Sequence, residues 1–135
     1  MNGAPDWLAA HTTEEWISAA LAEVTRAEGA YRQNDARGGL IAARRAAGMG
    51  LNAALLVEPN AAWGRTYIDH VEALAKDESV PEAVREAAKT LVDAKVPGTG
   101  IIGLRSRAGD ERVLEAAKDV IAHAYAVVAR ARPAS

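Results

Sequence analysis

The sequence predicts an all-helical bundle that forms one domain over residues 1–135. Apolar residues recur every three or four positions in several long segments, which is the spacing of one face of an α-helix. Helix-capping patterns stand at the starts of these segments, and no segment alternates apolar and polar residues as a half-buried strand would. A chain of 135 residues is of ordinary size for a domain with one core. We therefore expect four to five helices around a single core, with flexible ends at residues 1–11 and 133–135.

The first predicted helix begins at Thr12. Glu15 follows three residues later, and this pair matches the capping box, in which two side chains satisfy free backbone amides of the first turn. Ile17 and Leu21 lie beside the expected buried face. That face carries Trp16, Ala20, Val24, Ala27 and Tyr31.

The second predicted helix starts after Asn34 or Asp35, either of which could cap it, and stops before Pro59. Alanine and glycine are frequent in this segment, and small side chains let a neighbouring backbone approach closely. We therefore expect this helix to be the central one. Its apolar side carries Leu40, Ala43, Ala47, Leu51, Ala54 and Leu55.

Three more helices are predicted towards the C-terminal end. The third follows Asn60 and carries Trp63, Tyr67, His70, Val71 and Leu74. The fourth begins at Ser79–Glu82, with Pro81 in its first turn, and buries Val84, Ala88, Leu91 and Val92. The last runs from Asp110 to about Arg132 and carries Val113, Ala117, Val120, Ile121, Ala124, Val127 and Val128.

Composition and charge exclude several classes of protein. The chain has no cysteine, which excludes disulfides, thiolate metal sites and a cysteine nucleophile, and is typical of a reducing compartment. The first residues lack the basic and apolar regions of a secretory signal, and the run from Ala46 to Val57 is too short to cross a bilayer. We therefore expect a cytoplasmic protein without a membrane span. A net charge of -2 argues against a global field that would hold nucleic acid.

A long connection, residues 95–109, separates the last two predicted helices. Connections of this length in a bundle are usually functional or disordered. Gly98, Gly100 and Gly103 have the spacing of a dinucleotide-binding loop, but a helix rather than a strand precedes them, so the motif lacks its structural context. Arg105 and Arg107 are the residues of interest here, because guanidinium groups suit phosphate and carboxylate ligands.

Two further arginines, Arg44 and Arg45, are adjacent on the second predicted helix and are candidates for the same ligand-binding role. The alternative is that they form a solvated or paired face of that helix. No two histidines have the spacing of a metal site, so we predict neither a metal nor a cofactor.

Arg65 and His70 are the candidate catalytic pair. A histidine that moves a proton and an arginine that stabilises phosphate charge suit metal-independent cleavage of RNA. Five residues of a continuous helix rotate by about 140°, so the two side chains share a target only if Arg65 lies in an unwound first turn. Two other readings remain open: an ion pair between Arg65 and Asp69, and a half-buried, structural His70.

The order of these elements resembles the HEPN domain family of small prokaryotic helical domains. The resemblance rests on an amphipathic first helix from Trp16, a second with the segment 43–56, a polar entry at Asp69 and His70, a fourth helix at 87–91 and a last helix at 114–117. It covers nearly the whole chain and is one of layout.

The resemblance implies an up-and-down bundle that dimerises, binds a nucleotide or RNA and, in many members, acts as an RNase toxin with a nucleotidyltransferase-type antitoxin. Those RNases carry an Arg-x4-6-His motif near the last helices, whereas here the only Arg-x4-His runs from Arg65 to His70 in the third helix. We therefore expect a non-catalytic, dimeric HEPN-like module that binds a nucleotide, RNA or a partner protein. The alternatives are an RNase that uses Arg65 and His70, and a purely structural homodimer.

Overall fold

The computed structural model describes residues 5–95 and 107–131, and all regular structure within them is helical. The prediction of an all-α bundle is thus confirmed. The elements are α1 (Asp6–Ala9), α2 (Thr13–Arg32), α3 (Ala36–Val57), the 3₁₀ turn η1 (Ala61–Trp63), α4 (Tyr67–Ala75), α5 (Glu82–Asp93) and α6 (Arg107–Ala131).

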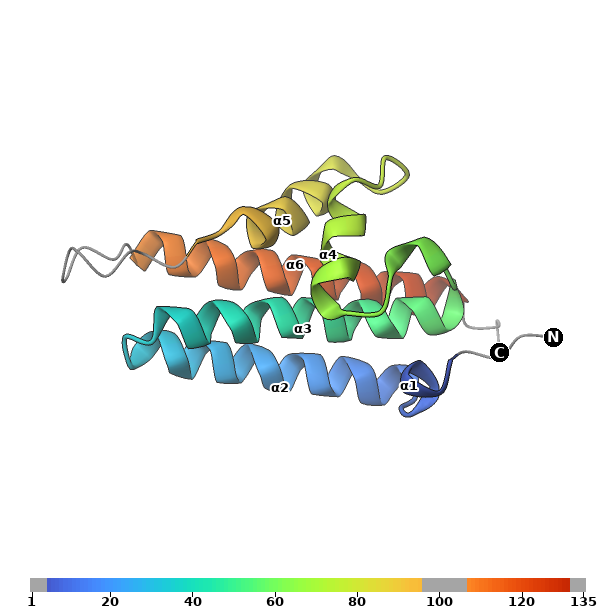
Figure 1. Cartoon of the computed structure of the whole chain (residues 1–135), viewed down its shortest axis with the longest axis horizontal. Coiled ribbons are helices and arrows are strands. Elements are labelled where there is room, and N and C mark those ends of the chain that lie inside the picture. The colour runs from blue at the N-terminus through green and yellow to red at the C-terminus, as the bar shows by residue number, and fades with distance from the viewer. Residues whose placement is uncertain (1–4, 96–106, 132–135) are drawn as a thin grey trace.

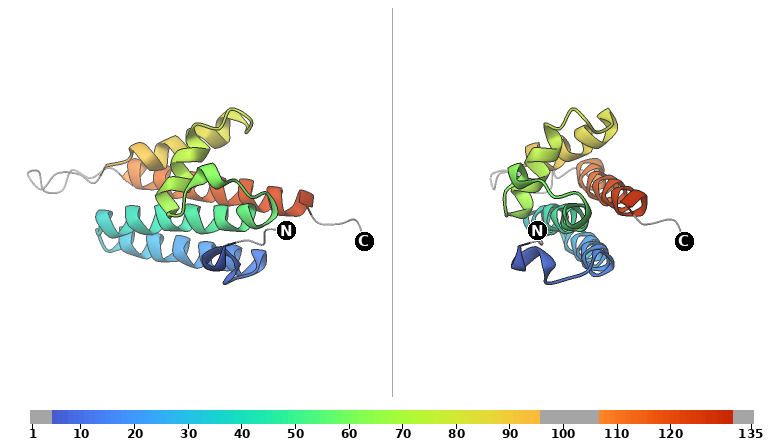
Figure 2. Two further views of the ribbon diagram at one scale, coloured as in Figure 1. Left: turned by 45° about the vertical axis from the view of Figure 1, so that its right-hand side comes forward. Right: turned by 90° about the vertical axis from the view of Figure 1, so that its right-hand side faces the viewer.

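Three long helices, α2, α3 and α6, lie side by side (Figure 1). The helices α2 and α3 are antiparallel, α3 and α6 run in the same direction, and α5 runs back along α6, so these four helices alternate in direction along the chain. The short α4 crosses α3, and Figure 2 shows α4 and α5 as a second layer over α3 and α6.

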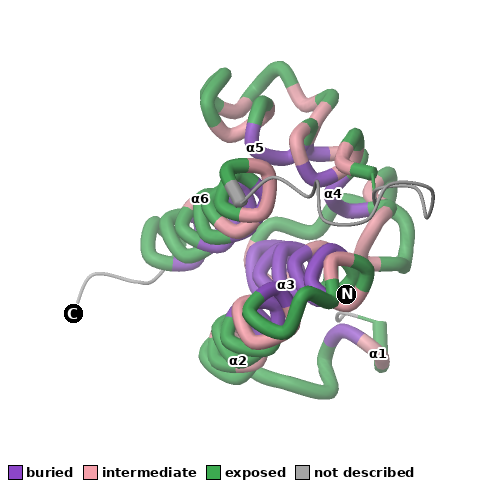
Figure 3. The backbone as a smooth tube through the Cα atoms, turned by 90° about the vertical axis from the view of Figure 1, so that its left-hand side faces the viewer, coloured by how far each residue is buried: buried purple, intermediate pink, exposed green. Residues whose placement is uncertain are grey.

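The central helix is α3, as predicted. In Figure 3 it is the most continuously buried element, enclosed by α2, α4 and α6. Its length and apolar composition would also suit a membrane span, but 67% of its most apolar stretch is buried inside the bundle, as in the core helix of a soluble protein. Length and composition alone are therefore weak evidence that α3 spans a membrane.

Small residues of α3 permit close packing. At Gly48, an added Cβ would collide with the Tyr67 Cβ and lie 2.6 Å from the Tyr67 Cα, so the first turn of α4 rests directly on the α3 backbone. This contact fixes where α4 crosses the central helix.

The predicted helix start at Thr12 is confirmed, and of the two candidate caps of the second helix, Asn34 and Asp35, it is Asp35 that caps α3. Thr12 and Glu15 form both hydrogen bonds of the capping box, and the Asp35 carboxylate accepts a hydrogen bond from the Gly38 amide at 2.8 Å. The predicted buried face of α2 is also confirmed. Leu21, expected beside that face, is 52% exposed instead.

The third predicted helix is wrong in its first half. Trp63 lies in η1, and Gly64, with φ 72°, turns the chain before the α-helix begins. Thr66 and Asp69 then form a second capping box that starts α4 at Tyr67. A local cap and a left-handed glycine therefore outweigh the continuous apolar periodicity.

Three other boundaries differ from the prediction. The helix α5 begins at Glu82, with Pro81 as its N-cap, because Ser79 bonds Asp77 rather than capping the helix. The helix α6 begins at Arg107, three residues before the predicted Asp110. The short α1 falls within residues 1–11, which were expected to be a flexible end.

The helix α1 is anchored by two contacts. Leu8 is 4% exposed, and its carbonyl accepts a hydrogen bond from the Trp16 indole Nε1 at 2.9 Å. This anchor brings α1 against the side of the bundle where α4 lies.

Candidate functional site

The predicted catalytic arginine, Arg65, lies outside α4. It precedes the N-cap Thr66 and is exposed. The rotation that would separate Arg65 from His70 on one continuous helix therefore does not apply. The alternative ion pair with Asp69 is not formed, and the Asp69 carboxylate instead accepts a hydrogen bond from the Thr66 amide at 3.3 Å. Hydrogen bonds from Thr66 hold the pKa of Asp69 below its usual value.

His70 is fully buried and holds one defined hydrogen bond. Its Nδ1 lies 3.0 Å from the carbonyl oxygen of Trp63. A carbonyl only accepts, so Nδ1 carries the hydrogen and Nε2 carries a lone pair in the neutral ring. Burial lowers the pKa of His70, against smaller opposite effects of the Trp63 carbonyl and Asp69. His70 is therefore a neutral imidazole at pH 7.

No hydrogen-bond partner reaches the His70 Nε2 from the described part of the chain. Two indole rings lie near the imidazole: Trp7 of α1 stacks on it with centroids 6.0 Å apart and an interplanar angle of 20°, and Trp63 lies at 6.4 Å, tilted by 40°. The Arg65 guanidinium lies 5.9 Å from the centroid of the Trp7 indole. Trp7 is thus the common neighbour of the predicted pair, and in this arrangement it shields the imidazole.

Arg44 does not face a ligand site. Its Nε donates to the Leu91 carbonyl at 2.8 Å, and its terminal nitrogen donates to the carbonyls of Val92 at 3.2 Å and Ala94 at 2.8 Å. These are free carbonyls at the end of α5, so Arg44 caps that helix from α3.

Arg45 points elsewhere and pairs with Glu23 of α2 at 3.6 Å, while Arg26 approaches the same carboxylate at 3.4 Å. Arg44 and Arg45 therefore serve different helix contacts and do not form one site. Arg105 and the side chain of Arg107 lie outside the described residues, as does the glycine motif at 98–103.

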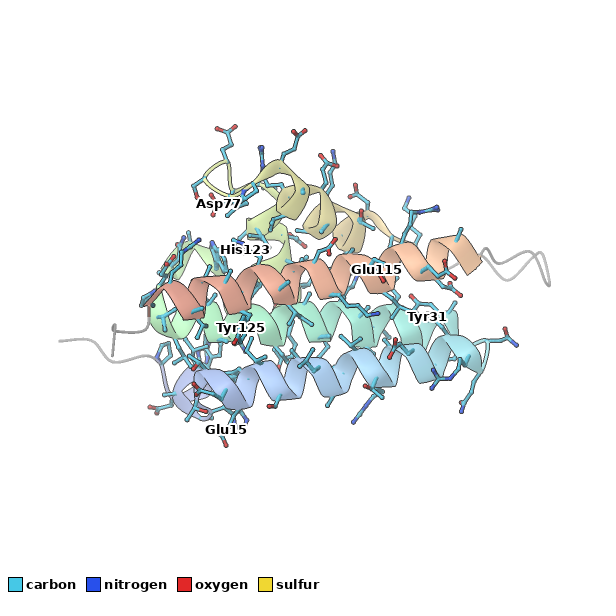
Figure 4. All side chains as sticks on the ribbon, turned by 180° about the vertical axis from the view of Figure 1, so that it is seen from behind. Glu15, Tyr31, Asp77, Glu115, His123 and Tyr125 are labelled. Carbon is cyan, nitrogen blue, oxygen red and sulfur yellow. The ribbon has the colours of Figure 1, made fainter. Side chains whose placement is uncertain are left out.

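A hollow of about 280 Å³ opens beside α6, and we call it the α6 cleft. Figure 4 shows two of its residues, Asp77 and His123, on the turn before α5 and on α6. The end of α3 and η1 supply the remaining wall. The lining residues are Ala54, Glu58, Pro59, Asn60, Trp63, Asp77, Ser79, Val80, Pro81, His123, Val127 and Arg130.

Charges of both signs meet in the α6 cleft. Arg130 and Glu58 form an exposed ion pair at 3.9 Å. The Asp77 carboxylate accepts from the Ser79 amide at 2.9 Å and from the Ser79 hydroxyl at 2.5 Å, and these bonds lower the pKa of Asp77. Partial burial and then Arg130 lower the pKa of His123, against opposite effects of Asp77 and Glu58. His123 is therefore mainly neutral at pH 7 and can both donate and accept.

A second hollow, an open groove of about 610 Å³, lies between α5 and α6. Arg112 is the cation in its lining, which also contains four carboxylates: Glu86, Glu111, Glu115 and Asp119. With four carboxylates against one guanidinium, this groove is more negative than the α6 cleft, where Glu58 and Asp77 lie with Arg130, so the α6 cleft is the better candidate for an anionic ligand.

Sequence reasoning missed the α6 cleft, because its walls come from three parts of the chain. The signal that could have found it is the spacing of His123, Val127 and Arg130, which places the three side chains on one face of a helix. Among the described residues, no group of three histidine or carboxylate side chains is arranged to hold a metal ion.

Comparison with models of known protein families, with curated proteins and with solved structures finds no match for this chain.

Proposed function

We propose that this chain is a non-catalytic helical module of the cytoplasm that binds a mononucleotide in the α6 cleft and works as a homodimer. The observation that carries the proposal is the presence of a guanidinium, a neutral imidazole and a tryptophan in one hollow, at Arg130, His123 and Trp63. Each of these groups can contact one part of a nucleotide: its phosphate, its ribose or its base.

The phosphate would bind Arg130. A guanidinium forms paired hydrogen bonds with phosphate. Replacement of Glu58 by phosphate as the partner of Arg130 costs little, because an exposed ion pair is worth at most about 1 kcal/mol. His123 lies two turns before Arg130 on the same helix and would add a hydrogen bond to a phosphate or ribose oxygen.

The base would lie against Trp63, which is half-buried in the wall of the cleft. Stacking of a base on an aromatic ring is worth about 1–3 kcal/mol and does not depend on the identity of the base. The Asp77 carboxylate is ionised and would accept hydrogen bonds from ribose hydroxyls or a base edge.

The size of the cleft favours a mononucleotide over RNA or a partner protein. Sites for small molecules usually enclose about 300–1,000 Å³, and the α6 cleft, at about 280 Å³, lies just below that range, so it has room for one small ligand and not for a longer chain. A net charge of -2 gives the chain no global positive field to hold a nucleic-acid backbone.

Thermal unfolding with each of the common nucleoside monophosphates at low salt tests the proposal. A ligand at 100 times its Kd stabilises the folded state by about 2.7 kcal/mol. We expect a concentration-dependent rise in Tm that Arg130→Gln abolishes. Arg26→Gln is the matched control, because Arg26 is equally exposed and also pairs with a glutamate, but lies on α2.

Two outcomes contradict nucleotide binding in the cleft: no nucleotide raises the Tm, or Arg130→Gln responds as the wild type does. A response to short RNAs but not to mononucleotides would favour RNA as the ligand instead.

Exposed apolar side chains support the homodimer. Leu21 of α2 and Tyr125 of α6 are each 52% exposed, on two neighbouring helices of the same bundle. Light scattering at micromolar concentration should give twice the chain mass, and Leu21→Glu with Tyr125→Glu should give the monomer. A monomeric wild type contradicts this part of the proposal.

The second candidate function is a metal-independent RNase that uses Arg65 and His70, with a nucleotidyltransferase-type partner as the resemblance implies. It is favoured by the position of Arg65 outside α4 and by the free lone pair of the His70 Nε2. RNA cleavage that His70→Ala removes would support it. Equal RNA cleavage by the wild type and His70→Ala, or no cleavage by either protein, contradicts this function.

A further inference from the structure

The region around His70 carries an inference separate from the α6 cleft. We propose that α1 is a displaceable cover over a latent anion site formed by His70 and Arg65. The proposal uses residues of the second candidate function, but it concerns binding and access and does not require RNA cleavage.

The first argument is the unused acceptor of His70. The Trp63 carbonyl fixes the hydrogen on Nδ1, so the buried Nε2 must accept a hydrogen bond to be satisfied, and none reaches it from the described residues. A buried polar atom without a partner is unfavourable and needs an explanation, such as a ligand or a functional state. A state that admits a donor to Nε2 relieves this cost.

The second argument is the position of Trp7. Its indole stacks on the His70 ring with centroids 6.0 Å apart, and the Arg65 guanidinium carbon lies 5.9 Å from the indole centroid. Both candidate ligand-binding groups therefore contact the same side chain of α1. Movement of this one ring would free the guanidinium and open the face of the imidazole on which it stacks.

The third argument is that α1 is weakly held. It has four residues, too few for a helix that is stable by itself, and its N-cap Pro5 provides no side-chain hydrogen bond. Besides the ring contacts of Trp7, the buried Leu8 and one hydrogen bond from Trp16 hold it to the bundle. The rest of the bundle does not depend on α1 for its core, which is built from the longer helices.

The groups under α1 match a singly protonated phosphate. The P–OH would donate to the Nε2 lone pair, and the charged oxygens would accept from Arg65. A neutral imidazole suits this ligand because it accepts a hydrogen bond, which an imidazolium cannot do. The site therefore differs from the α6 cleft, where the ligand would bind without displacing a helix.

Carbethoxylation with diethyl pyrocarbonate, quantified at each histidine by mass spectrometry, measures access to His70. In the wild type we expect His70 to react at least about tenfold more slowly than the exposed His11. Trp7→Ala should bring the two rates within about threefold, whereas Trp7→Phe, which keeps a ring over His70, should not. His123, outside this region, should react equally in all three proteins.

Inorganic phosphate then tests the anion site. In Trp7→Ala, phosphate at millimolar concentration should slow the reaction of His70 several-fold relative to chloride of equal ionic strength. The double variant Trp7→Ala with Arg65→Gln should lose this protection. Faster reaction of His123 would reveal that Trp7→Ala unfolds. In that case hydrogen exchange of the wild type replaces the protection experiment. Phosphate should then speed exchange of the α1 amides, and Arg65→Gln should remove this effect.

Some results would overturn the proposal. If His70 stays as slow in Trp7→Ala as in the wild type, α1 is not its cover. If phosphate protects His70 equally with and without Arg65, or not at all, there is no anion site beneath α1. Neither result bears on nucleotide binding at Arg130, so the two proposals fail separately.

Discussion

Two regions of this bundle each contain a histidine and an arginine, and they use them differently. In the interior around α3, α4 and α5, His70 bonds the Trp63 carbonyl and Arg44 caps α5. In the α6 cleft, His123 is half-buried and Arg130 is exposed beside Glu58. The same residue types are therefore enclosed in one region and accessible to solvent in the other, and burial and hydrogen-bond partners make the difference.

The largest loss of stability should come from Gly48→Ala, a substitution in the interior region. The new Cβ would overlap Tyr67 and push α4, with His70, away from α3. We expect a loss of about 2–3 kcal/mol in the free energy of unfolding, the usual cost of overpacking a core. Urea unfolding measures it.

Gly29→Ala is the control for that experiment. A Cβ at Gly29 meets only the Arg32 side chain at 3.8 Å, so this variant should gain up to about 1 kcal/mol from helix propensity. A Gly48→Ala protein as stable as the wild type would show that α4 is not packed as closely as described.

Arg44→Met should have the next largest effect. Methionine keeps an apolar stem like that of arginine but leaves the carbonyls at the end of α5 without their donor, which should cost about 2 kcal/mol. Arg130→Met removes only an exposed ion pair and should cost less than about 1 kcal/mol. Chemical denaturation measures both losses. If Arg44→Met and Arg130→Met lose the same free energy of unfolding, Arg44 is not more important to the fold than Arg130.

The pH dependence of stability should also separate the two histidines. Both have a lowered pKa in the folded chain, so the unfolded chain binds protons more readily, and stability falls as pH drops below about 6.5. The slope is at most about 1.4 kcal/mol per pH unit for each histidine. His70→Gln should flatten it more than His123→Gln, because His70 is fully buried.

Unfolding between pH 5 and 6.5 measures this slope without interference from carboxylates. Asp69, Asp77 and Glu15 have lowered pKa values, so their contributions are lost only below about pH 4.5. If His70→Gln loses stability more steeply than the wild type as the pH falls, His70 is not a neutral, buried imidazole.

The sequence predicted the helices well because periodicity and caps are local signals. Thr12, Asp35 and the apolar face of α6 needed no knowledge of the rest of the chain. The break at Gly64 was missed because the apolar spacing continues across it. The short α1 was missed because Trp16 and α3, rather than its own sequence, hold it in place.

The functional residues were less predictable because their roles depend on distant partners. Arg44 looked available on its own helix, yet its partners lie 47 to 50 residues later in the chain. The α6 cleft joins residues near 58, 77 and 123, which no local motif connects. Sequence reasoning identified His70 and Arg65 but could not foresee that Trp7 lies over both.

The smallest expected effect concerns Glu58, which competes with a ligand for Arg130. Glu58→Gln keeps the shape of the side chain and removes the negative charge 3.9 Å from the guanidinium. An exposed pair is worth at most about 1 kcal/mol, so an anionic nucleotide should bind about threefold more tightly, which is about 0.7 kcal/mol. Glu115→Gln is the matched control, because Glu115 also pairs with a cation on the surface but lies outside the cleft. Because Glu58 opposes the lowering of the His123 pKa, its removal delays protonation of His123, so the rise in affinity that an imidazolium gives for an anion should appear at lower pH than in the wild type. Titration calorimetry measures both effects, and weaker binding by Glu58→Gln would mean that the carboxylate contacts the ligand rather than competing with it.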